Sequence, residues 1–105
     1  MKFCLKSGAK TVTTAGTRVA LSTTAIWARG IRISAPSGNA GVIYIGDVTV
    51  AASNGISIAA AGILSFSEVF INPPGDLVSI NLKDVYVDAA TNGDKVTFAY
   101  LEPVS

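Results

Sequence analysis

A run of β-branched residues that ends in an Asn-Gly pair occurs twice in this chain, first at residues 41–55 and again at residues 85–93. Val and Ile suit a pleated strand because their χ1 freedom is already small. Asn and Gly tolerate the positive φ that tight hairpin turns require. The closing sequences, Ala-Ala-Ser-Asn-Gly and Ala-Ala-Thr-Asn-Gly, predict two equivalent strand-and-turn units in one β domain. In the first unit we expect strands at residues 41–45 and 47–51.

The composition agrees with a β protein. The 105 residues include 21 Val and Ile, but only six Leu, two Glu and no Gln. Helix surfaces are usually filled with Glu, Gln, Lys and Leu, and a chain of this length makes one domain. We therefore expect residues 1–105 to fold as a single all-β domain. The prediction is an antiparallel β-sandwich, jelly-roll-like or Ig-like, with about eight to ten short strands.

Several segments carry more specific predictions. Residues 1–8 form a possible N-terminal arm, because Ser-Gly at its end breaks the strand pattern. Trp27 lies in an alternating segment and is predicted to be a core or inter-sheet anchor. Residues 59–62 are predicted to be a compact connection, because the flanking segments keep a period of two. The Pro-Pro sequence at residues 72–76 predicts a loop, and residues 77–82 a strand.

The chain offers few signs of export or of a membrane. Cys4 is the single cysteine, so no intramolecular disulfide can form. No signal peptide is visible, and no stretch approaches the ~18 consecutive apolar residues that a membrane helix needs. We expect a protein made and folded in a reducing cytoplasm, with no membrane partner.

The side chains that usually carry catalysis are scarce. The absence of histidine removes the Ser-His-Asp and Cys-His systems and the usual zinc ligand sets. Asp47, Asp88 and Asp94 are the remaining catalytic candidates, and the segment from Asp88 to Asp94 distantly resembles a calcium loop. It lacks the required ligand spacing, and Asp beside a turn commonly bonds its own backbone. We expect no enzyme activity, no catalytic residue, no metal and no cofactor.

The charges are divided unevenly along the chain. Residues 1–46 carry six bases and no acid, whereas the remainder carries seven acids and two bases. One interpretation is that basic and acidic strands pair across a sheet. The other is that a basic side of the molecule faces an acidic partner. The bases are scattered singly, without interleaved aromatics, so no nucleic-acid partner is expected.

Four phrases together resemble the small all-β virion proteins of tailed bacteriophages, which decorate or cement the capsid. They are Gly-Val-Ile-Tyr-Ile-Gly-Asp-Val-Thr-Val at residues 41–50, Asn-Gly-Ile at 54–56, Leu-Lys-Asp-Val-Tyr-Val-Asp at 82–88 and Thr-Asn-Gly-Asp-Lys-Val at 91–96. The likeness extends from about Val19 to Leu101. It departs from the usual pattern at residues 59–62, where a more polar turn would be expected.

The resemblance implies a decoration protein on the capsid exterior, made in the bacterial cytoplasm and released by lysis. Its partners would be the major capsid protein and further copies of itself, as a homotrimer or homodimer at a symmetry axis. The basic N-terminal half would then face an acidic capsid surface. The candidate interface residues are Lys2, Phe3, Leu5, Lys6 and Lys10, together with Phe70 and Ile71 from the most hydrophobic segment.

Three alternatives stay open. The first is another virion part, such as a tail, neck or fibre component or a host-surface adhesin. The second is a carbohydrate-binding β-sandwich, although the aromatics lie in strand patterns that favour the core. The third is a hydrolase that uses a pair of carboxylates such as Asp88 and Asp94.

Overall fold

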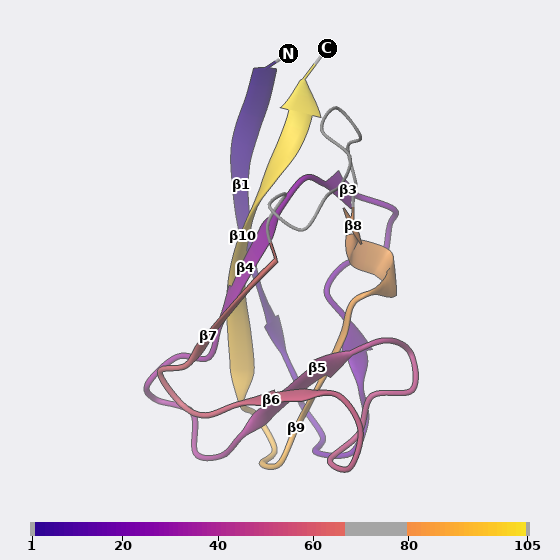
Figure 1. Cartoon of the computed structure of the whole chain (residues 1–105). Helices are drawn as coiled ribbons and strands as arrows, with labels where there is room; N and C mark the ends of the chain where they lie inside the picture. The colour runs from indigo at the N-terminus through magenta and orange to yellow at the C-terminus, as the bar shows by residue number, and fades with distance from the viewer. Residues whose placement is uncertain (1, 67–79, 105) are drawn as a thin grey trace.

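The computed structural model describes residues 2–66 and 80–104, which form an all-β structure (Figure 1). The described elements are β1 (Lys2–Thr11), β2 (Val19–Ala20), β3 (Trp27–Ala28), β4 (Ile31–Ser34), β5 (Ile43–Gly46), β6 (Ile56–Ile58), β7 (Ile63–Phe66), β8 (Ile80–Asn81), the 3₁₀ helix η2 (Leu82–Asp84), β9 (Tyr86–Ala89) and β10 (Lys95–Val104). The all-β prediction is confirmed.

The strands pair as one antiparallel ribbon folded back on itself. β1 pairs with β10, β2 with β9, β3 with β8, β4 with β7 and β5 with β6. Two further pairings, β10 with β4 and β9 with β5, wrap the ribbon into sheets of order β1-β10-β4-β7 and β2-β9-β5-β6. Without the short β3-β8 pair, this is the strand order of a jelly roll. Of the two predicted sandwich types, the strand order therefore agrees with the jelly-roll-like type and not with the Ig-like type.

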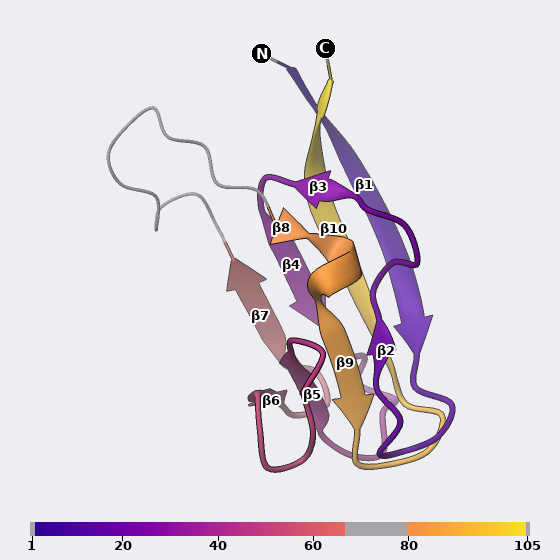
Figure 2. The ribbon, with the colours of Figure 1, turned by 90° about the vertical axis from the view of Figure 1, so that its right-hand side faces the viewer.

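The core lies between the two four-stranded sheets, which Figure 2 views face on, with β9 of one sheet in front of β10 of the other. Alternate residues point inward along each strand. Ile31 and Ile33 in β4 are buried, and so are Ile43 and Ile45 in β5. Along β10 the buried side chains are Val96, Phe98 and Tyr100. The rings of Phe98 and Tyr100 stack with their centroids 6.1 Å apart, so the core contains aromatic as well as β-branched side chains.

The two repeated units lie side by side, because β5 and β9 pair antiparallel. Gly55 and Gly93 have φ values of +120° and +84°, so both Asn-Gly turns use the positive φ that the sequence predicts. The predicted strand at residues 47–51 is wrong. The Asp47 carboxylate accepts hydrogen bonds from the Thr49 amide and hydroxyl, at 2.9 and 2.5 Å, and this local turn ends the strand at Gly46.

The predicted break at Ser7 and Gly8 is also wrong, because β1 continues through Gly8 to Thr11 and pairs with β10 over its full length. The N-terminal segment is therefore part of the sandwich. The predicted connection at residues 59–62 is confirmed, closed by the Gly62 amide donating to the Ala59 carbonyl at 2.8 Å. The predicted loop at 72–76 and the start of the strand at 77–82 lie outside the described residues. The described remainder of that strand is β8, followed by η2.

Trp27 is not a core residue: its side chain is 56% exposed, whereas the next residue, Ala28, is fully buried. The strand is interrupted at Arg29 and Gly30, between β3 and β4. The interruption moves the inward positions by one residue, so that Ala28 and Ile31 both face the core. Trp27 consequently points outward from the short β3-β8 pair.

Candidate interaction surface

The β1-β10-β4-β7 sheet presents one side to the core and the other to solvent. Because side chains alternate along a strand, the residues between the buried positions of β4 and β10 point outward, and the register extends this set to β1 and β7. We call this set the outer face. Its residues are Leu5, Ser7, Ala9, Thr11, Arg32, Ser34, Ile63, Ser65, Lys95, Thr97, Ala99 and Leu101.

The outer face is weakly charged and carries exposed apolar side chains. Seven of its twelve residues are Ser, Ala or Thr, two are basic and none is acidic. Leu5 and Leu101 lie directly opposite each other and are 71% and 41% exposed, and Ile63 at the other edge is 53% exposed. Exposed apolar surface of this kind marks sites of protein–protein contact more often than isolated apolar side chains do.

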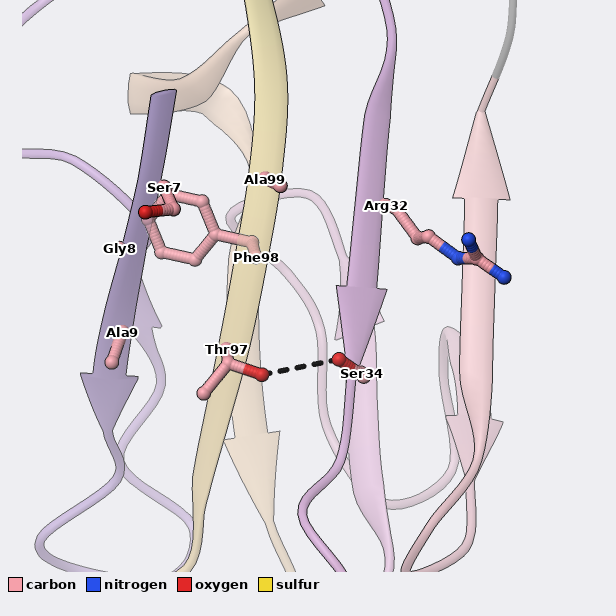
Figure 3. A pocket seen from close by; sticks show the side chains of 8 residues that line it. All are labelled: Ser7, Gly8, Ala9, Arg32, Ser34, Thr97, Phe98 and Ala99. Atoms are coloured by element: carbon pink, nitrogen blue, oxygen red, sulfur yellow. Dashed lines mark hydrogen bonds between the residues drawn. The ribbon is translucent and has the colours of Figure 1, made fainter. Parts of the chain in front are cut away.

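Small side chains leave two shallow hollows on this face. The larger, about 550 Å³, lies over β1, β10 and β4 and is shown in Figure 3. In it the Ser34 and Thr97 hydroxyls lie 3.1 Å apart and share a hydrogen bond. The smaller, about 350 Å³, is lined by residues that include Leu5, Tyr100 and Leu101. Both are open, so they suit protruding side chains of a partner better than a small enclosed ligand.

Arg32 lies near the middle of the outer face. Its register partners are Ala99 on β10 and Ser65 on β7, so the residues directly opposite it on both flanking strands are small. In Figure 3 its side chain extends away from β10, over β7. Since the outer face has no acid, an acidic side chain of a partner would complement Arg32 with charge-assisted hydrogen bonds.

The sequence-predicted interface residues are only partly brought together. Leu5 belongs to the outer face, whereas Lys6 is exposed and Lys10 half-buried on the opposite side of β1. Lys2 and Phe3 lie in β1, paired with β10, and Phe70 and Ile71 lie outside the described residues. The outward positions of β10 were not among the predicted interface residues, although Thr97, Ala99 and Leu101 alternate with the buried Val96, Phe98 and Tyr100.

The observed strand pairings disagree with the interpretation that basic and acidic strands pair across a sheet. In the pairings of the described strands, no Lys or Arg lies directly opposite an Asp or Glu. Lys6 is opposite Tyr100, and Lys10 is opposite Val96. Direct cross-strand pairing therefore does not account for the basic residues of β1 and β4.

The catalytic candidates hold loops in place. Asp88 is buried, and its Oδ1 accepts hydrogen bonds from the Gly16 and Ala89 amides at 2.9 and 2.8 Å. Asp94 is also buried and accepts from two successive amides that precede β5. The hydrogen bonds from Thr49 lower the pKa of Asp47 below its ordinary value of 3.8. No group of three or more potential metal ligands occurs among the described residues.

No known family model matches this chain, and no curated protein is similar to it in sequence. Within the described part of the chain, no helix has the length and apolar character needed to cross a membrane.

Proposed function

We propose that this protein is a bacteriophage structural protein that decorates the capsid exterior and stabilises the shell through protein–protein contacts. Two lines support the proposal: the resemblance of its sequence to small all-β virion proteins, and a jelly-roll sandwich with a weakly charged outer face. The observation that carries it is the outer face, where Leu5, Leu101 and Ile63 are exposed around small residues.

Such a protein acts by binding. Contact with neighbouring capsid subunits buries apolar area and needs no titratable chemistry. A protein that binds the assembled shell, and not the separated subunits, stabilises the shell by mass action. Arg32 would select capsid subunits with an acidic side chain at the matching place, and a homotrimer or homodimer at a symmetry axis would present several outer faces together.

The copy number in purified virions tests this proposal. Quantitative mass spectrometry against labelled peptides of this chain and of the major capsid protein gives the ratio of the two. A decoration protein occurs in a ratio near one copy, or a simple fraction of one copy, per capsid subunit. A few copies per particle would contradict decoration and favour a tail, neck or fibre component.

One observation favours a second candidate, a carbohydrate-binding module. Trp27 is 56% exposed in the β3-β8 pair, and an exposed aromatic ring suits stacking on the face of a sugar ring. Titration with a panel of glycans, followed by Trp27 fluorescence, tests it. A saturable shift supports the module, and an unchanged spectrum with all glycans rejects it.

A further inference from the structure

β1 forms an edge of its sheet. Among the described residues it pairs with β10 alone, and this pairing covers all ten of its residues. Natural proteins rarely leave a long, regular edge strand open, because its free N–H and C=O groups can pair with another chain. The other edge of the same sheet, β7, has four residues.

The hydrogen bonds around β10 show which groups of β1 face the open edge. The Leu101 carbonyl accepts from the Arg29 amide, and the Leu101 amide donates to the Gly30 carbonyl, so the backbone of Leu101 faces β4. In an antiparallel ladder successive residues alternate sides, so Tyr100 and Phe98 turn their N–H and C=O groups toward Lys6 and Gly8 of β1.

The other end of β1 agrees with this alternation. The Val12 amide donates to the Asp94 carbonyl at 2.9 Å, so an even-numbered residue again faces the β10 side. The odd-numbered residues therefore direct their backbone groups away from β10. They are Leu5, Ser7, Ala9 and Thr11, and all four are exposed.

The charges of β1 indicate the chemistry of the segment that fits this edge. Lys6 and Lys10 lie on the same side of the strand, the side opposite to Leu5. The one acid nearby in β10 is Glu102, which is opposite Cys4 and therefore diagonal to Lys6. An added strand that alternates acidic and apolar residues would place acids beside the lysines and apolar side chains beside Leu5.

A second copy of β1 is a poorer occupant. When two antiparallel β1 strands are related by a two-fold axis, even-numbered residues lie opposite even-numbered residues. Lys6 and Lys10 of both copies therefore lie on the same side of the joint sheet. Like charges in that position are destabilising, and lysines on an edge strand are a common protection against self-pairing.

We propose that the open edge of β1 binds an extended segment of a partner protein, with alternating acidic and apolar residues, as an added strand. The edge groups of Leu5, Ser7, Ala9 and Thr11 supply the main-chain hydrogen bonds, and Lys6 and Lys10 select the acids. The inference goes beyond the proposed function and does not depend on it, because any partner with such a segment would fit.

The test uses the full chain and a fluorescent, end-blocked peptide of about eight residues that alternates Val and Glu. Fluorescence polarisation gives its Kd for wild type, Ala9→Pro and Ala9→Thr. Proline removes an edge N–H and is tolerated on edge strands, whereas Ala9→Thr changes the side chain and keeps the N–H. We expect Ala9→Pro to weaken binding at least tenfold and Ala9→Thr to leave it within about twofold.

A second measurement covers the case in which Ala9→Pro does not fold. In wild type, the peptide should slow hydrogen exchange at the amides of Ser7 and Ala9, while the Gly8 amide, already bonded to β10, changes little. A peptide with Lys in place of Glu should bind at least tenfold more weakly.

Three results would overturn the inference. They are no binding of the Val-Glu peptide at millimolar concentration, equal binding of the Val-Lys peptide, and edge amides that exchange at an unchanged rate. A concentration-dependent dimer that Ala9→Pro abolishes would assign the edge to a second copy and would equally overturn an acidic partner.

Discussion

Gly8 and Phe98 lie opposite each other in the β1-β10 ladder, and a Cβ atom at Gly8 would lie 2.8 Å from the Cζ atom of the Phe98 ring. The missing side chain is what lets the ring cover the glycine, an arrangement that relieves the weakness of glycine in a strand. Phe98 is 9% exposed and stacks on Tyr100, so its ring has little room to move away.

Replacing Gly8 with Ala should therefore destabilise the fold. We expect Gly8→Ala to lower the free energy of unfolding by about 1–3 kcal/mol, because the added methyl group overpacks the ring. Urea denaturation measures it. Gly38→Ala is the matched control, because a Cβ there meets nothing within 4 Å, and it should be neutral or stabilising by up to ~1 kcal/mol. Equal effects of the two substitutions would contradict the role given to Gly8.

Asp94 connects the start of β10 to the segment before β5. Its two carboxylate oxygens accept from the Ala40 and Gly41 amides at 2.9 and 2.8 Å, and the side chain is 6% exposed. Asp94→Asn keeps one acceptor and sets an NH₂ group against the other amide, which should cost about 1–3 kcal/mol of unfolding free energy. The control is Asp84→Asn, at an exposed position in η2, which should change it by less than ~0.5 kcal/mol. An Asp94→Asn variant as stable as wild type would show that the two hydrogen bonds contribute little.

The pKa of Asp47 predicts a local response to acid. The Thr49 hydroxyl and amide hold the pKa of this carboxyl below 3.8 in the folded chain. A group with a depressed folded pKa adds stability above its unfolded pKa, and that stability is lost as the pH falls through the folded pKa. Thr49→Val removes the hydroxyl, so the pKa of Asp47 should rise toward its ordinary value. An NMR titration of the Asp47 carboxyl carbon measures this, and an unchanged pKa in the variant would contradict it.

Ala61 has a φ of +68° in the turn between β6 and β7. For an L-residue other than glycine, this conformation costs about 1–2 kcal/mol. Ala61→Gly removes the cost, although glycine adds about 0.4–1 kcal/mol of unfolded-state entropy. We expect a net stabilisation of up to ~1 kcal/mol in urea denaturation, and Ala60→Gly, its neighbour in the same turn, should destabilise. A loss of stability in Ala61→Gly would mean that the turn relaxes without strain.

The sequence predicted the local features of this fold, but it did not predict which strands pair when they lie far apart along the chain. The alternation of Val96, Phe98 and Tyr100 with polar or small residues is the local pattern of a half-buried strand, and both Asn-Gly turns formed as expected. The outward position of Trp27 depends on an interruption of the strand at Arg29 and Gly30, and not on the alternation of its immediate neighbours. The continuity of β1 through Gly8 depends on Phe98, which is 90 positions away in the sequence.

The outer face could not be predicted from the sequence for the same reason. Leu5 and Leu101 become neighbours only when the first and last strands pair, and no local pattern predicts that pairing. Lys6 and Lys10 were expected in the same interface as Leu5, but the alternation of a regular strand places them on its other side. The outer face and the lysines of β1 consequently lie on opposite sides of the sheet.

The proposal that the outer face binds the capsid is tested most directly by comparing two charge reversals. Arg32→Glu changes the outer face, whereas Arg18→Glu makes the same change at an exposed residue before β2. Co-sedimentation with capsids emptied of DNA gives the affinity of each variant. We predict that Arg32→Glu weakens binding at least tenfold and that Arg18→Glu binds within about twofold of wild type. Equal binding of wild type and both variants would contradict the claim.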